Sequence, residues 1–222
     1  TFGNRKRLGD KAFFAQCREK IEKGEVWHSG ENVFIQMVTY SGHSPFKMPE
    51  SLKTVHFSNR IPEIMADYMT VAHYTDEAIG KFVEYLKTRP EYERTIVVIT
   101  GDHEGLADHR KELCHTKAGK GIIPENEFTP FIVLNSPVPM HYPQVMGHDI
   151  YPTLLNLHGL EKFRWSGIGQ SILEPRKPGI AISPKRKIEG DTLHISEDEL
   201  LRIRRSPVIS DRIIRFDKLK DL

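Results

Sequence analysis

Residues 95–105 read TIVVITGDHEG, an apolar, β-branched run followed by Gly101 and a polar turn. Such a run is typical of a strand buried inside a parallel sheet. A second run, FIVLN at 131–135, predicts another interior parallel strand. Apolar residues recur every three or four positions over 61–86, which predicts a long amphipathic helix between a first strand and these two. The pattern favours an α/β fold in which helices cover both faces of a parallel sheet.

Segments on either side extend this pattern. Residues 9–25 predict a short amphipathic helix, with Asp10 as its cap and Gly24 as its stop. The run VFIQMVTY at 33–40 is too short for most helices and predicts a buried strand. Residues 148–160 predict a helix that contains a proline near its start and ends at a glycine.

The composition changes after residue 173. Residues 174–187 contain prolines and a cluster of basic residues, which predicts a linker rather than a core element. Residues 196–205 predict a short helix that begins at a serine, and the remaining tail has mixed character. We therefore expect two parts, residues 1–173 and residues 174–222.

The composition excludes several classes of protein. Of 222 residues, 32 are Lys or Arg and 30 are Asp or Glu, and this balance argues against a dedicated nucleic-acid binder. No stretch approaches the ~20 apolar residues of a membrane helix, so we expect the chain itself to be soluble. Cys17 and Cys114 form no disulfide framework. Because the first residue is Thr1, we expect a fragment or a processed product.

Polar residues follow the predicted strands, where parallel α/β sheets carry their chemistry. Asp102 and His103 come directly after 95–100, and their oxygen and nitrogen atoms suit Zn²⁺ or Mn²⁺. An isolated Asp-His pair is more often a polar turn, but His43, His115 and His148 also lie in loops or at a helix start. We expect these residues to converge on one metal and one anionic substrate. We interpret the following as surface or packing residues: His28, His56, His73, His141, His158 and His194.

Several motifs occur in a fixed order from residue 9 to residue 173: GDKAFFAQCREKI, VTYSGHSPF, YMTVAHYTDEAIGKFVEYLKTRPEYERTIVVITGDHEG, FTPFIVLNSP and MGHDIYPTLLNLHGL followed by GIGQSIL. In this order they resemble the sulfatase and phosphoglycerol-transferase group of the alkaline phosphatase superfamily, especially lipoteichoic acid synthase-like proteins. The resemblance implies a three-layer α/β/α sandwich with a parallel-rich sheet, incomplete because the N-terminal half is missing. Residues 1–173 would then be the C-terminal part of a catalytic domain, and 174–222 a basic linker and appendage.

The same resemblance assigns roles to residues. It implies that Asp102 and His103 bind one divalent ion, Mn, Zn or Ca, together with a Glu and a nucleophile from the absent half. It implies that His43, in the TxSxHxPF motif, contacts the phosphate-bearing substrate. His115 stands 13 residues beyond Asp102, where relatives place a histidine near the metal. His148 precedes an Asp-x-x-Pro-Thr helix, as in many sulfatases, and would bind substrate.

The predicted function is therefore that of a metal-dependent phosphotransferase or sulfuric ester hydrolase that acts through an upstream nucleophile. Its substrate would be a lipid- or glycan-linked phosphate or sulfate ester. The complete protein would be extracytoplasmic and membrane-anchored through segments outside this chain. One alternative is a non-catalytic binding module with the same fold, because no Ser, Thr or Cys here matches the nucleophile. A nucleotide-binding domain is disfavoured, because no GxGxxG or P-loop motif follows a predicted strand.

Overall fold

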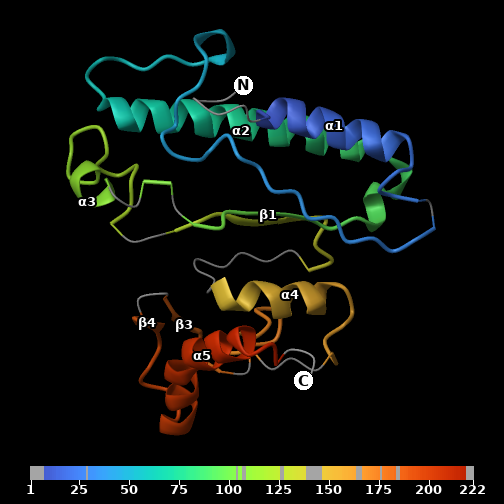
Figure 1. Cartoon of the computed structure of the whole chain (residues 1–222), viewed down its shortest axis with the longest axis vertical. Helices are drawn as coiled ribbons and strands as arrows, with labels where there is room; N and C mark the ends of the chain where they lie inside the picture. The colour runs from blue at the N-terminus through green and yellow to red at the C-terminus, as the bar shows by residue number, and fades with distance from the viewer. Residues whose placement is uncertain are drawn as a thin grey trace. The chain divides into compact units, whose positions relative to one another are not determined.

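The computed structural model describes residues 8–28, 30–103, 105–106, 109–125, 128–138, 147–163, 167–175, 177–183 and 186–218 (Figure 1). The chain divides into two compact units, residues 1–135 and residues 136–222. The functional boundary expected at residue 173 stays a prediction.

The first unit begins with helix α1, Asp10–Glu22. Phe14 and Ile21 lie on its buried face, as the predicted periodicity requires. The chain leaves the helix through Gly24, whose φ of 67° falls in the left-handed region that favours glycine. The helix predicted over 9–25 is thus confirmed, including its stop.

The predicted cap of α1 is wrong. The residue that precedes the helix is Gly9, and no side chain makes a capping hydrogen bond there. Asp10 is 1% exposed, and its carboxylate accepts hydrogen bonds from two other segments of the first unit. Aspartate is a common capping residue, but this carboxylate stabilises long-range contacts instead.

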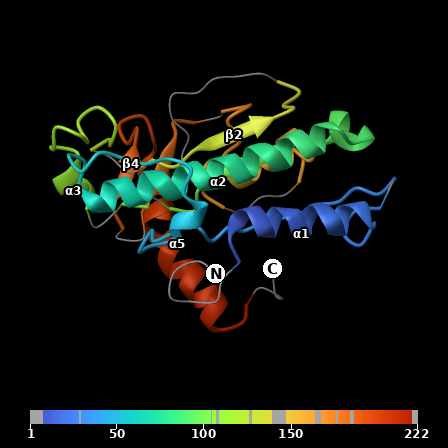
Figure 2. The same ribbon diagram turned by 90° about the horizontal axis from the view of Figure 1, so that it is seen from above.

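Helix α2, Glu63–Lys87, is 25 residues long and confirms the prediction for 61–86. Figures 1 and 2 both show α1 running alongside it. Phe14 of α1 stacks on Phe82 of α2 with ring centroids 4.9 Å apart. Val97 packs against the cluster that these rings form, so the helices cover one face of the strand to which it belongs. Burial of each aromatic side chain contributes about 1.5–3 kcal/mol to folding.

Two strands complete this layer, β1 at Val97–Thr100 and β2 at Phe131–Leu134. They occur where the sequence predicts strands, but they pair antiparallel, with Val97 opposite Leu134. The prediction that both are parallel is therefore wrong. A continuous β-branched run indicates burial on both faces and carries no information about direction. Three short helical turns connect these elements: Glu50–Leu52, Pro90–Arg94 and α3 at Arg110–Leu113.

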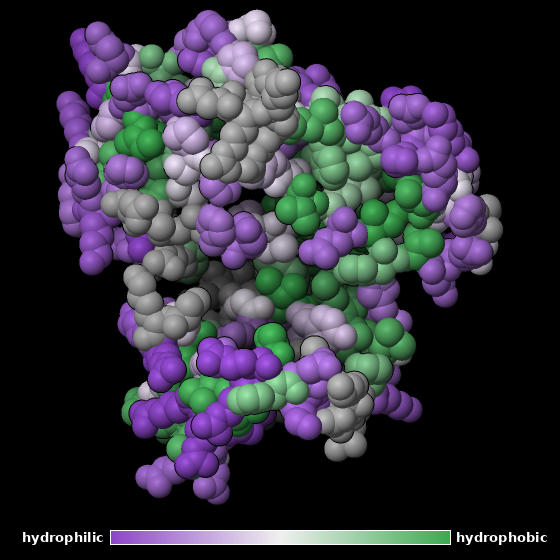
Figure 3. Space-filling view, in the orientation of Figure 1, coloured by the Kyte–Doolittle hydropathy of each residue, from purple (hydrophilic) through white to green (hydrophobic). Residues whose placement is uncertain are grey.

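The strand predicted over residues 33–40 is absent. This segment has no regular secondary structure and pairs with no strand in the part of the chain that the structure describes. Phe34 is 78% exposed and Val38 is 73% exposed, and hydrophobic side chains reach the surface of the first unit in Figure 3. A strand is buried only when neighbouring strands accept its hydrogen bonds, and the described residues supply no such neighbour here.

The second unit begins with a 3₁₀ turn, Gly147–Asp149, that leads into helix α4, Ile150–Leu157. Gly159 follows with a φ of 71°. The helix predicted over 148–160 is confirmed, although its first turn has 3₁₀ geometry.

A hairpin begins within the predicted linker and ends just after it. Strands β3, Ile180–Ile182, and β4, Ile188–Gly190, pair antiparallel. Ile180 and Ile182 are buried against Ile203, so this segment belongs to the core of the second unit. The flanking prolines and basic residues suggested a linker, but alternate isoleucines with a period of two form one buried strand face.

Helix α5, Glu197–Arg215, begins at the serine that the sequence predicts. The Ser196 hydroxyl accepts a hydrogen bond from the Glu199 backbone N–H at 3.2 Å. Arg202 donates to both carboxylate oxygens of Glu199 at 2.7 and 2.8 Å, and Lys177 donates as well. These hydrogen bonds lower the pKa of the Glu199 carboxyl to about 2, so the first turn of α5 stays charged at neutral pH.

The tail forms one continuous helix rather than a short helix and a mixed segment. Pro207 lies inside α5 and has no N–H to donate to the carbonyl of Ile203. The Ser206 hydroxyl donates to that carbonyl at 2.8 Å instead. This hydrogen bond satisfies the acceptor that proline leaves without its backbone partner.

Candidate functional site

Asp102 and His103 follow β1 directly and are both exposed. The Gly101 N–H donates to the Pro130 carbonyl at 3.4 Å, which holds the turn beside the start of β2. The Asp102 side chain is 87% exposed and the His103 ring 68% exposed. His103 Nε2 lies 3.6 Å from Asp102 Oδ2, and the His103 backbone N–H donates to Asp102 Oδ1 at 3.0 Å. The turn therefore presents an oxygen and a nitrogen donor to solvent side by side.

This donor pair is suited to a divalent metal but does not complete a metal site. A carboxylate oxygen and an imidazole nitrogen are ligands of Zn²⁺ and Mn²⁺. Across the described ranges, no group of three or more His, Cys, Asp or Glu residues gathers as a metal site would require. Protein zinc sites use three or four protein ligands. Asp102 and His103 therefore have the right chemistry for two ligands of such a site.

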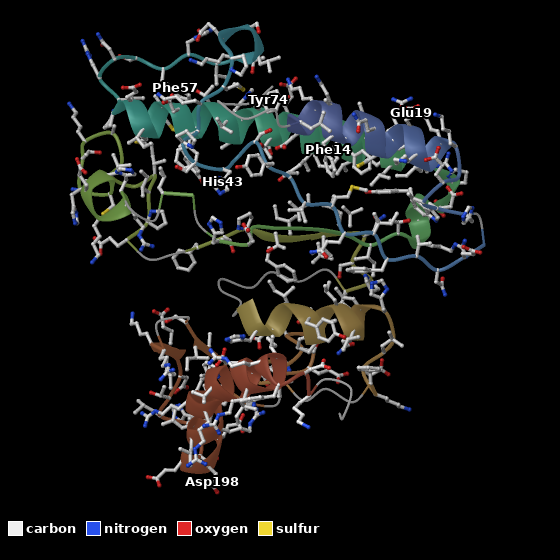
Figure 4. All side chains as sticks on the ribbon, in the orientation of Figure 1. Phe14, Glu19, His43, Phe57, Tyr74 and Asp198 are labelled. Carbon is white, nitrogen blue, oxygen red and sulfur yellow. The ribbon has the colours of Figure 1, made fainter. Side chains whose placement is uncertain are left out.

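His43 is exposed and lies in a turn formed by residues 40–46. Its ring stacks on Tyr40 with centroids 5.1 Å apart and planes 12° apart. His43 Nδ1 is 2.7 Å from the Ser44 carbonyl oxygen. Since a carbonyl only accepts, Nδ1 carries a proton, and Nε2 is an acceptor in the neutral ring and a donor in the imidazolium. Figure 4 shows His43 on the side of α2 that faces β1.

Three candidate segments are anchored in one hydrophobic cluster built on α2. The segments are those that contain His43, His103 and His115, and each contributes a buried residue to the cluster. These residues are Phe46, Leu106 and Leu113. Each lies two or three positions from its histidine in the sequence, so the backbones of the three segments approach the same cluster. His115 itself is exposed, directly after α3.

Tyr68 of α2 touches two of these segments. Its ring packs edge-on against Phe46, with centroids 5.3 Å apart. A Cβ atom at Gly105 would lie 2.3 Å from the same ring. The loop after Asp102 therefore needs a glycine at this position, because the aromatic ring occupies the space of a side chain.

We expect Gly105→Ala to lower the free energy of unfolding by about 1–3 kcal/mol, because Tyr68 is packed against Phe46 and has little room to move. Denaturant unfolding measures the change. The matched control is Gly80→Ala, since Gly80 is exposed in α2 and a Cβ there meets nothing within 4 Å. In that control, the free energy of unfolding should rise by about 0.5–1 kcal/mol. Equal stability of the two variants would contradict the close packing at Gly105.

His148 lies in the second unit and is partly buried. Its Nε2 is 3.2 Å from the carbonyl oxygen and 3.3 Å from the backbone nitrogen of Ile182. These contacts join the start of α4 to β3. The predicted role of His148 in substrate binding depends on how the two units meet and stays a prediction.

Most of the histidines that the sequence assigns to the surface or to packing are exposed. These are His28, His56, His73, His158 and His194; His141 lies outside the described residues. The sequence predicts Asp10 only as a helix cap, whereas its carboxylate accepts hydrogen bonds from the segment that carries His43. An aspartate at a helix start is typical of a cap, so no local signal distinguished this role.

The comparison with protein families gives a clear assignment. The Sulfatase family model matches residues 4–160, which is more than half of the chain. The chain belongs to the sulfatase family. The resemblance that the ordered motifs predicted is thereby confirmed.

Curated relatives of this sulfatase-family chain include lipoteichoic acid synthases. Lipoteichoic acid synthase 2 of Bacillus subtilis is 26% identical, and the alignment covers 98% of this chain and 37% of the relative. The lipoteichoic acid synthase-like protein YvgJ of the same organism is 27% identical over 69% of this chain and 26% of its own length. The chain thus spans about a third or less of the length of these relatives.

Solved structures confirm the fold class. An alkaline phosphatase superfamily protein from Vibrio parahaemolyticus matches with a TM-score of 0.59 and 18% identity, over 98% of this chain and 57% of that one. The lipoteichoic acid synthase LtaP from Listeria monocytogenes matches with a TM-score of 0.56 and 18% identity, over 96% and 62% of the two chains. The fold is therefore the α/β fold of the alkaline phosphatase superfamily. Within the described residues, no helix combines the length and apolar character needed to cross a bilayer.

Proposed function

We propose that this chain supplies the Asp-His portion of the active site in a metal-dependent phosphoglycerol transferase or sulfuric ester hydrolase. The nucleophile and the remaining metal ligand would lie outside these 222 residues. One observation carries the proposal: exposed Asp102 and His103 follow β1, and their segment shares a hydrophobic cluster with the His43 segment. The family match and the short coverage of the relatives support it.

Asp102 and His103 would bind the divalent ion through a carboxylate oxygen and an imidazole nitrogen. When bound, such an ion neutralises charge on ester oxygens and lowers the pKa of an attacking hydroxyl. Zn²⁺ and Mn²⁺ suit this oxygen and nitrogen pair, and Ca²⁺, which prefers oxygen ligands, is a candidate only through the family resemblance.

His43 would act on the substrate through Nε2. With Nδ1 donating to the Ser44 carbonyl, the imidazolium directs its second N–H away from that carbonyl. This N–H can donate to a non-bridging oxygen of a phosphate or sulfate. It can also transfer its proton to the leaving alcohol as the ester P–O or S–O bond breaks. His115 would provide a second donor from a segment anchored in the same cluster.

A lipid- or glycan-linked phosphate ester is the substrate class that we place first. Relatives named lipoteichoic acid synthases support this choice over a sulfate ester, although both esters present tetrahedral oxyanions to the same donors. For the complete protein we propose an extracytoplasmic location and a membrane anchor outside this chain. The near balance of charges argues against a role in nucleic-acid binding.

We expect the isolated 222-residue chain to be catalytically silent and the complete protein to be active, because the catalytic groups act as a unit. The experiment compares both proteins on a chromogenic phosphodiester and a chromogenic sulfate ester, with Mn²⁺, Zn²⁺ or Ca²⁺ added. Turnover by the isolated chain at the rate of the complete protein would show that the nucleophile lies within it.

A binding module without turnover is the second candidate, because no Ser, Thr or Cys of this sequence matches the family nucleophile. The complete gene product distinguishes the two functions. The enzyme requires an upstream strand that ends in Thr, Ser or Cys. It also requires a separate acidic metal ligand. A complete protein that binds inorganic phosphate but cleaves neither ester would support the binding module.

A further inference from the structure

The carboxylate of Asp10 joins three segments of the first unit. Its Oδ1 accepts hydrogen bonds from the backbone N–H groups of Tyr40 at 3.1 Å and Ser41 at 3.0 Å. Its Oδ2 accepts a hydrogen bond from the Thr75 hydroxyl of α2 at 2.8 Å. In return, the Asp10 N–H donates to the Ser41 hydroxyl at 3.0 Å. Asp10 is 1% exposed, so these hydrogen bonds are shielded from water.

These contacts fix the beginning of the turn that carries His43. Tyr40 is bonded to Asp10 through its backbone and stacks on His43 through its ring. The His43 N–H donates to the Tyr40 carbonyl at 3.1 Å. The end of the turn is fixed by Phe46, which is 3% exposed in the cluster on α2. The His43 ring is therefore exposed on a turn whose two ends are both held by buried groups.

We propose that Asp10 is a positioning residue for His43, which it orients through the backbone of Tyr40 and Ser41. The inference rests on the proposed function, because it assigns Asp10 a role in the reaction in which His43 contacts the substrate. Asp10 does not touch the substrate itself. Charge-assisted hydrogen bonds to backbone N–H groups are stronger than neutral ones. Because a buried carboxylate without hydrogen-bond partners is strongly destabilising, the Tyr40 and Ser41 N–H groups are held in place.

A purely structural role for Asp10 predicts a different result. Loss of a structural hydrogen bond lowers the free energy of unfolding and leaves the folded fraction fully active. Loss of a positioning residue lowers kcat in the folded protein, because catalytic groups lose rate when they are displaced by about 1 Å. The two roles are separated by kcat measured on folded protein, and amide exchange at Tyr40 and Ser41 reports whether the turn has lost its hydrogen bonds.

The test uses Asp10→Ser and Asp10→Asn in the complete protein. Serine keeps a small polar side chain but lacks the carboxylate, so we expect kcat to fall roughly 10- to 100-fold with little change in KM. Asparagine keeps one oxygen that can accept from Tyr40 and Ser41, so it should retain most of kcat. Hydrogen exchange at the Tyr40 and Ser41 amides should accelerate in Asp10→Ser and stay slow in Asp10→Asn. The control is Asp76→Ser, at an exposed carboxylate of α2, with no effect expected.

His43→Ala separates the failure of this inference from the failure of the proposed function. In that background, Asp10→Ser should cause no further loss of kcat, because the two residues act through one group. If Asp10→Ser lowers kcat as much in the His43→Ala background as in the wild type, the positioning role is overturned. It is also overturned if the Asp10→Ser protein is folded and fully active while the His43→Ala protein is impaired. A fully active His43→Ala protein would overturn the proposed function and the positioning role together.

Discussion

Asp102→Ala should remove the bound metal from the complete protein and lower turnover by more than about 10³-fold. A divalent ion contributes several kcal/mol to such reactions, and each 1.4 kcal/mol changes the rate about tenfold. Asp102 is 87% exposed and accepts a backbone hydrogen bond from the adjacent His103, so its loss should leave the fold intact. Metal analysis of the purified protein is the primary measurement, because it does not depend on the choice of substrate.

Glu93→Ala is the matched control for this experiment. Glu93 is an exposed carboxylate in the helical turn Pro90–Arg94, at the other end of β1 from Asp102. We expect this variant to keep both the metal content and the turnover of the wild type. Equal metal content in the Asp102→Ala and wild-type proteins would eliminate Asp102 as a ligand. The isolated chain should bind metal weakly in either form, because two donors hold a divalent ion poorly.

The elements that the sequence predicted correctly are those with a local signal. The period of 3.6 residues in α2 and the β-branched runs of β1 and β2 depend on neighbours in the sequence, and all three elements form where expected. The direction of β2 relative to β1 depends on long-range pairing, and this prediction was wrong. The strand predicted over residues 33–40 was wrong for the same reason, since a strand forms only when it pairs with another strand.

The sequence locates the candidate residues along the chain, but it does not report the contacts that hold their segments in place. The position of Asp102 and His103 after β1 follows from the sequence, because loops after strands carry polar groups. The hydrogen bonds of Asp10 to Tyr40 and Ser41 join residues about thirty positions apart, and no periodicity reports such contacts. The hairpin of β3 and β4 was missed because its isoleucines lie among prolines and basic residues that are typical of linkers.

His43→Ala should lower turnover of the complete protein by roughly 10²-fold or more, with the metal content unchanged. The ring is exposed and makes its hydrogen bond to the adjacent Ser44, so the substitution should cost little stability. Steady-state kinetics and metal analysis on the same preparation measure both effects. His56→Ala is the control, since the His56 side chain is exposed and its Nδ1 lies 3.7 Å from a Glu50 carboxylate oxygen.

His43→Gln tests which step the imidazole serves. The glutamine amide keeps an N–H that can donate to a non-bridging oxygen, but it cannot transfer a proton to the leaving group. If His43 mainly stabilises the oxyanion, glutamine should recover part of the turnover that alanine loses. If His43 is the general acid, glutamine and alanine should be equally slow on an ester with a poor leaving group, and both should improve on an ester whose alcohol leaves without protonation. Unchanged kinetics in both variants would reduce His43 to an exposed residue of the turn between Tyr40 and Phe46.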